Sequence, residues 1–336
     1  MLSQQDKPIY IARVGGWRKK VGGGSRDPAV HSSIDVEGRT IHDAPAHAKE
    51  NAMSAESTPG QPFVGEDWAG EMGERWLANL SGFEGSIALI GAALIDHAGY
   101  AAGERVLDLG CGGGATTLDI ARHVGPDGQA VGLDVSPALI DFATRRAAEA
   151  GCDNVTFVCA DAATARVAHE PFDRLFSRFG SMFFAEPVPA FANIRSMLKP
   201  GARIDLAVWA PPADNPWMAG AMGAVRNHVA LPAPVSRAPG PFAFEEPHYL
   251  SEVLDQADFS DVRVTPHTCL LPVGGPGKTP EEAARFVTSA MAFGQALHDQ
   301  PESVRAAAMK DILALFEAHH IPDSGVVMGA KVWLVS

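Results

Sequence analysis

The chain has little cysteine: four residues among 336, and no two of them form a C-x-x-C pair. The scattered residues Cys111, Cys152, Cys159 and Cys269 therefore predict neither a zinc site nor a disulfide framework, and no metal is expected. Few, unpatterned cysteines are typical of a reducing compartment. We therefore expect a cytoplasmic protein.

Long apolar runs and an excess of basic residues are also missing. No apolar run approaches the roughly 20 residues that a membrane span requires. With 27 Lys and Arg against 40 Asp and Glu, the formal net charge is −13, whereas nucleic-acid binding depends on clustered Lys and Arg. We expect neither a membrane span nor a nucleic-acid partner. A hydrophobic content of 46% is sufficient for the core of one large domain or of one domain with a lid.

The first 60 residues show no sustained hydrophobic period. They are rich in Gly, Ser, Pro, His and mixed charge, a composition typical of disorder. A basic start is not followed by an apolar core, so a secretory signal is not expected. Met53 begins a stretch that resembles an ordinary N-terminus, and residues 1–52 are interpreted as an extension of the gene model. We expect a disordered extension over residues 1–60.

The most informative stretch is RVLDLGCGGGATT, residues 105–117. An apolar run ends at a cluster of glycines and helical spacing resumes at Ala115, which predicts a strand, a tight turn and a helix. Glycines let the backbone approach a ligand closely, and the first N–H groups of the helix point at it. Gly110, Gly112 and Ala115 also fit G-x-G-x-x-A, which alone suggests NAD or FAD.

The carboxylate of Asp108 decides between these ligands. It lies two residues before the first glycine, where we expect it at the mouth of the turn. There it would repel a pyrophosphate and attract a positively charged ligand. S-adenosylmethionine (SAM) carries an ammonium and a sulfonium and no phosphate. The sequence therefore predicts SAM as the cofactor, with an NAD(P)-binding oxidoreductase as the alternative.

The segment Asp108-Leu-Gly-Cys-Gly-Gly-Gly resembles motif I of the class I SAM-dependent methyltransferases, especially the group similar to the ubiquinone and menaquinone biosynthesis methyltransferases. The resemblance extends from Trp68 to the C-terminus. It implies a Rossmann-like α/β fold: a seven-stranded, mostly parallel sheet with helices on both faces and an antiparallel last strand. It also implies direct displacement of a methyl group from SAM onto the O, N or C atom of a small apolar or aromatic molecule. A non-catalytic SAM-binding regulator is the second alternative.

The resemblance places one domain over residues 61–336. We expect a core at 100–210 and helical lid insertions at 211–246 and 268–325. The hydrophobic pattern predicts a sixth strand over 259–265 and a last, antiparallel strand over 326–335. The sequence leaves a homodimer open.

Two later strands also end in a carboxylate. The strand over 130–134 ends at Asp134, 24 positions after Gly110, near the offset at which an acidic residue meets ribose hydroxyls. The strand over 155–160 is followed by Asp161, and the resemblance assigns Asp161 and Ala162 to the adenine. Because parallel strands end at one edge of a sheet, all three acids are expected there. The predicted cofactor-binding residues are Asp108, Gly110, Cys111, Gly112, Asp134, Val135, Asp161, Ala162 and Ser177.

The acceptor is expected near the exit of the fourth strand, over residues 177–184, and beneath an N-terminal helix that begins near Trp68. The resemblance places the transferred methyl group at this exit, and the insertion over 211–246 leaves the same edge of the sheet. Candidate acceptor contacts are Trp76, Phe179, Met182, Asn215 and Trp217. Core packing explains such aromatics equally well. No His or Asp occupies a position that identifies a general base, so the sequence assigns no catalytic residue.

Overall fold

The computed structural model describes residues 67–336. The predicted disordered extension over 1–60 lies outside the described residues. Within the described part, no single helix is long and apolar enough to cross a membrane; helices α1 (Glu71–Ala78) and α2 (Leu80–Ala98) meet that test only as a pair, with an 80° bend between them. The division of the domain into a core and lid insertions stays a prediction.

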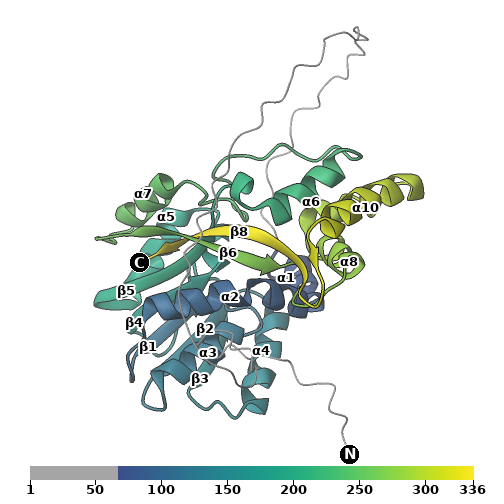
Figure 1. Ribbon diagram of the computed structural model, residues 1–336. Helices are drawn as coiled ribbons and strands as arrows, with labels where there is room; N and C mark the ends of the chain where they lie inside the picture. Colours follow the sequence, from purple (N-terminus) through teal and green to yellow (C-terminus); the bar gives the residue numbers. More distant parts are fainter. Residues whose placement is uncertain (1–66) are drawn as a thin grey trace, which may run out of the picture. The chain divides into compact units, whose positions relative to one another are not determined.

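A central sheet organises the described residues (Figure 1). Its strands run in the order β3-β2-β1-β4-β5-β8-β6, and a short strand β7 pairs with β8. Neighbours among β1 to β5 are parallel, while β8 is antiparallel to both β5 and β6. The predicted Rossmann-like, mostly parallel sheet with an antiparallel last strand is confirmed. The strands are β1 Arg105–Leu109, β2 Gln129–Asp134, β3 Val155–Cys159, β4 Phe172–Arg178, β5 Leu198–Trp209, β6 Val264–Pro272, β7 His320–Ile321 and β8 Gly325–Val335.

Two of the described helices, α4 and α8, start at a side-chain cap. Ser136 accepts a hydrogen bond from the Leu139 N–H ahead of a first-turn proline, and Thr279 with Glu282 forms a capping box, both of which satisfy N–H groups that a helix start leaves unpaired. The helices are α1 Glu71–Ala78, α2 Leu80–Ala98, α3 Ala115–Val124, α4 Pro137–Glu149, α5 Pro187–Ser196, α6 Pro216–Arg226, α7 Pro247–Gln256, α8 Pro280–Ala290, α9 Ala292–Gln295 and α10 Glu302–Glu317, with 3-10 turns η1 Gly180–Phe183 and η2 Pro212–Asp214.

The prediction of a sixth strand over 259–265 is wrong in its position. Strand β6 begins at Val264 and continues to Pro272. Asp258 and Asp261 adopt φ angles of 64° and 58°, which are left-handed turn conformations that an extended strand cannot contain. Phe259 between them is buried, so its apolar character reflects core packing of a turn.

The segment between β6 and β8 forms a helical layer beside the N-terminal helices. It contains α8, α9 and α10; α8 contacts α1, and α10 packs against α6 and α8. In Figure 1 these helices gather at one end of the sheet, close to α1. This arrangement brings residues more than 200 positions apart in sequence together, as in the hydrogen bond from the Ser289 hydroxyl to Asn79 Oδ1 at 2.7 Å.

Candidate functional site

The turn between β1 and α3 requires glycine for geometric reasons. Gly110, Gly112 and Gly114 have φ angles of 66°, 54° and 77°, in the left-handed region that side chains with a Cβ atom rarely adopt. A Cβ atom on Gly110 would also lie 2.6 Å from the Cα of Gly180, in the 3-10 turn after β4. The Gly110 N–H donates to the carbonyl oxygen of Leu133 at 2.8 Å, which ties the turn to β2.

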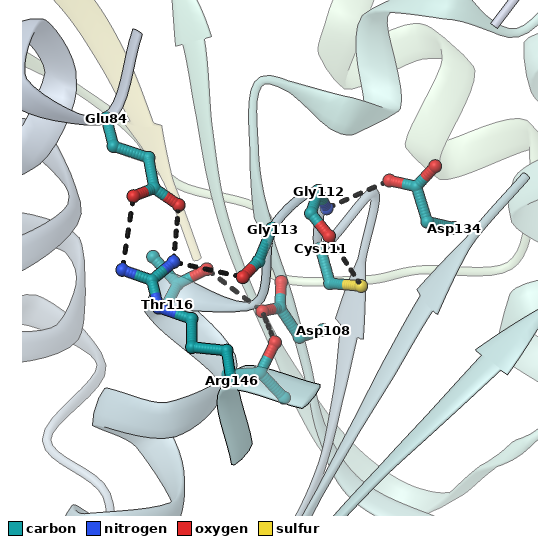
Figure 2. Close-up of polar contacts among 9 residues, drawn as sticks. Glu84, Asp108, Cys111, Gly112, Gly113, Thr116, Asp134 and Arg146 are labelled. Atoms are coloured by element: carbon teal, nitrogen blue, oxygen red, sulfur yellow. Dashed lines mark hydrogen bonds and ion pairs between the residues drawn. The ribbon is translucent and has the colours of Figure 1, made fainter. Parts of the chain in front are cut away.

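Asp134, at the end of β2, is joined directly to this turn. Its Oδ2 accepts the Gly112 N–H at 2.9 Å (Figure 2). Its Oδ1 accepts the Ser136 N–H at 3.0 Å. Burial raises the pKa of Asp134, and the hydrogen bonds from backbone N–H groups oppose this shift. Each carboxylate oxygen keeps a second acceptor direction. Asp134 therefore has the capacity to accept hydrogen bonds from a diol while it holds the turn.

Asp108 does not lie at the mouth of the turn, and the predicted placement is wrong. Its side chain is buried, and Oδ2 accepts hydrogen bonds from the hydroxyls of Thr116 at 2.9 Å and Thr117 at 2.7 Å. These threonines belong to the first turn of α3, so the carboxylate points inward under the helix. Burial raises its pKa to about 6. We therefore do not assign Asp108 a direct contact with a ligand.

Cys111 fills the space beneath the turn. The thiol is buried, and burial, followed by the nearby carboxylates of Asp134 and Asp108, raises its pKa well above the usual value. A cysteine reacts as a thiolate, which a raised pKa disfavours. The geometry supports a packing role for Cys111 and not a nucleophilic one.

The third strand end contributes Asp161 and Ala162 at the same edge of the sheet. Asp134 pairs with Cys159 in the parallel register of β2 and β3, so Asp161 follows two residues beyond that pair. Asp161 is exposed, and its Oδ1 accepts the Ala163 N–H at 2.9 Å. Val135, beside Asp134, is 36% exposed. The glycine turn, Asp134, Val135 and Asp161 therefore lie along one edge.

The Ser177 side chain makes hydrogen bonds to backbone groups beside the site. Its buried hydroxyl donates to the Leu109 carbonyl at 2.9 Å and accepts the Ser181 N–H at 3.2 Å. These bonds attach the exit of β4 to the end of β1. Ser177 therefore positions the exit segment, and its hydroxyl is not directed at open space.

An ion pair that the sequence does not reveal clamps the glycine turn. Arg146 of α4 contacts both carboxylate oxygens of Glu84 in α2, at 2.7 and 3.2 Å, and donates to the carbonyl of Gly113 at 3.0 Å (Figure 2). The Glu84 side chain is 6% exposed and that of Arg146 19%. A bidentate pair of this kind has a narrow geometry. It holds α2, α4 and the glycine turn together.

Aromatic side chains from α1, from α2 and from the segment just before α1 cover the turn. Trp76 lies 3.6 Å from the position of a Cβ atom on Gly112 and stacks on Phe83 with ring centroids 3.7 Å apart. Trp68 packs edge-on against Phe183 and Trp76, at 4.7 and 5.6 Å. The structure therefore brings the predicted acceptor residue Trp76 to the glycine turn, within an apolar lid.

The other predicted acceptor residues are buried. Phe179 stacks on Trp209 at 4.2 Å, and Trp217 lies 5.5 Å from the same ring; Met182 is 2% exposed. Asn215 donates to the carbonyls of Ala210, Pro211 and Lys331 and accepts the Lys331 N–H at 3.0 Å. These bonds occupy the Asn215 amide in joining the end of β5 to β8, so the acceptor site we propose does not include Asn215.

The described residues contain no group of three or more His, Cys, Asp or Glu arranged to hold a metal ion.

Comparison with known proteins gives a family match over the strand–turn–helix region. Residues 106–201 match the model of a methyltransferase domain.

Curated relatives match between about a third and a half of the chain. It is 35% identical over 115 residues to the aklanonic acid methyltransferase of a Streptomyces species, covering 34% of this chain and 52% of that protein. This chain is 29% identical over 179 residues to the nocamycin O-methyltransferase of Saccharothrix syringae, and the match covers 51% of this chain and 64% of that protein. This chain is 30% identical over 122 residues to the ubiquinone/menaquinone biosynthesis C-methyltransferase of Pseudomonas aeruginosa, and the match covers 36% of this chain and 48% of that protein. The chain thus spans about half the length of the curated relatives it matches.

Proposed function

We propose that this chain belongs to the class I SAM-dependent methyltransferase family and is an enzyme that transfers a methyl group from SAM to a small molecule; the methyltransferase-domain match and the methyltransferase relatives support this. The observation that carries the proposal is the union of the glycine turn with Asp134 at the carboxyl edge of a parallel sheet. Open α/β sheets bind ligands at this edge.

The residues present fit SAM. The positive φ angles at Gly110 and Gly112 bring the backbone close to a ligand without intervening Cβ atoms. The free acceptor directions of Asp134 suit the two ribose hydroxyls. Val135, exposed beside it, offers an apolar surface to the adenine, and we assign Asp161 and Ala162 to the adenine edge.

The chain's own contribution to the reaction is alignment and exclusion of water. When bound, SAM supplies a methyl group on a good leaving group, its sulfonium. The enzyme then has to hold the acceptor in line and keep water out. Trp68, Trp76 and Phe183 form an aromatic cover above the glycine turn, which suits that task. We assign no general base.

The relatives' names support a small acceptor. They name aklanonic acid, nocamycin and the biosynthesis of ubiquinone and menaquinone. The aromatic cover over the turn favours an apolar or aromatic acceptor. The net charge of −13 favours a free small molecule over a nucleic acid, and we expect the enzyme to act in the cytoplasm.

Calorimetry with SAM, S-adenosylhomocysteine and NADH tests the cofactor. We expect binding of the first two and none of NADH; binding of NADH alone would refute the proposal in favour of an oxidoreductase. Incubation with labelled SAM and a panel of phenols, quinols and amines tests catalysis. Transfer to none of them by a chain that binds SAM tightly would favour the non-catalytic regulator.

A further inference from the structure

A groove lies apart from the glycine turn, between the joint of α1 and α2 and the helical layer of α8, α9 and α10. Its volume is about 800 Å³, within the range of roughly 300–1,000 Å³ that small-molecule sites occupy. Phe286, Leu297 and Met309 give it apolar walls. Gly82 is also part of its lining, and a Cβ atom there would lie 2.5 Å from the Phe286 ring.

The lining of this groove carries more cationic than anionic side chains. Lys278, Arg285 and Arg305 line it, against a single carboxylate from Glu282. Glu282 is already bonded to Lys278 at 3.0 Å, and Arg305 is paired with Glu302. Arg285 is exposed and makes no hydrogen bond or ion pair with any residue from 67 to 336. Because the other two cations of the lining are already paired, Arg285 is the group that favours an anionic ligand.

We propose that this groove binds the methyl acceptor, and that the acceptor is a planar apolar molecule with a carboxylate group held by Arg285. The proposal rests on the proposed methyltransferase function. A guanidinium recognises a carboxylate through two parallel N–H donors. The apolar walls of the groove take the rest of the molecule.

A series of aromatic rings connects the groove to the glycine turn. Phe286 packs edge-on against Phe83 at 5.1 Å, and Phe83 stacks on Trp76, which lies over Gly112. Among the described residues, no hydrogen bond ties these three side chains to their neighbours. Rings held by packing alone can change rotamer without breaking a polar contact, so an aromatic acceptor can replace part of this wall and reach the turn.

A fluorescence titration with 1-hydroxy-2-naphthoate and its neutral amide tests the proposal. We expect the native chain to bind the carboxylate about tenfold more tightly than the amide, as expected for one charge-assisted hydrogen-bonded contact. Arg285→Gln should abolish this preference. Arg263→Gln, which removes an exposed charge just before β6, should keep it. Met309→Trp, which fills the groove, should weaken both probes.

Three outcomes would overturn the proposal: binding of neither probe, equal binding of acid and amide by the native chain, or a preference that survives Arg285→Gln. Calorimetry with SAM on the same preparations separates this result from the proposed function. Arg285→Gln should bind SAM as the native chain does. If the native chain bound naphthoate as expected but did not bind SAM, the proposed function would fail while the anion site would stand.

Discussion

Replacing Arg146 by methionine is expected to lower the free energy of unfolding and to weaken SAM binding together. The change removes both contacts to Glu84 and the bond to the Gly113 carbonyl. It leaves a carboxylate with 6% exposure without its principal cation. Breaking a buried pair by removing one partner costs about 3–5 kcal/mol. The Gly113 carbonyl belongs to the proposed cofactor turn, so the turn should also lose part of its order.

A double-mutant cycle measures this clamp. Urea unfolding of Glu84→Met, Arg146→Met and the double variant gives the coupling, and calorimetry with SAM gives the effect on the turn. The double variant should be destabilised by much less than the sum of the two single variants, because no buried charge is left unpaired. Additive effects would refute the reasoning. Arg145→Met, at an exposed position next in the helix, is the matched control and should change stability by no more than about 0.5 kcal/mol.

Three further predictions concern the same edge of the sheet. Asp134→Ala should weaken SAM binding by about 1.5–3 kcal/mol, the usual contribution of hydrogen bonds to a charged group; unchanged affinity in calorimetry would remove Asp134 from the ribose. Gly114→Ala should lower the free energy of unfolding by about 2 kcal/mol or more, because φ is 77° and the new Cβ would lie 2.7 Å from the Phe157 ring; an unchanged melting temperature would contradict this. Burial raises the pKa of Asp108 and of Asp205 from 3.8 to about 6, so the folded chain binds more protons than the unfolded chain between these values. The resulting stability is present below pH 3.8 and is lost as the pH rises through about 6, by up to about 3 kcal/mol for each group. Urea midpoints measured at several pH values should show this fall, and Asp108→Asn should reduce it. If the dependence of stability on pH were the same in Asp108→Asn as in the native chain, this prediction would be wrong.

The local elements were predictable where their signal is contiguous. Strand β1, the glycine turn and α3 are specified by neighbouring residues, because an apolar run, glycines that need a positive φ and a helical period follow one another in residues 105–117. The start of β6 could not be predicted in the same way, because the turn at Asp258 and Asp261 has the same apolar pattern as a strand. Hydrophobic period reports burial, and burial alone does not distinguish a packed turn from a strand end.

Contacts between distant segments had no such signal. Glu84 and Arg146 are 62 positions apart, and each lies in a helix where a charged residue ordinarily faces solvent. Ser289 and Asn79 are 210 positions apart, and the basic groove is built from both of their segments. The spacing rules that locate the glycine turn act over a few residues, so they carry no information on which helices meet.

Although Asp108 points inward, its negative charge still disfavours a dinucleotide at the glycine turn. An acid at the β2 end such as Asp134 meets ribose hydroxyls in dinucleotides as well, so it does not by itself select SAM. A pyrophosphate would bind at the N-terminus of α3, where unpaired N–H groups and the helix dipole attract negative charge. Asp108 is bonded to Thr116 and Thr117 in that first turn, and with a pKa of about 6 it is mostly ionised at neutral pH. Its charge therefore offsets the attraction of the helix end for phosphate from beneath the turn, which disfavours a dinucleotide although the carboxylate touches no ligand.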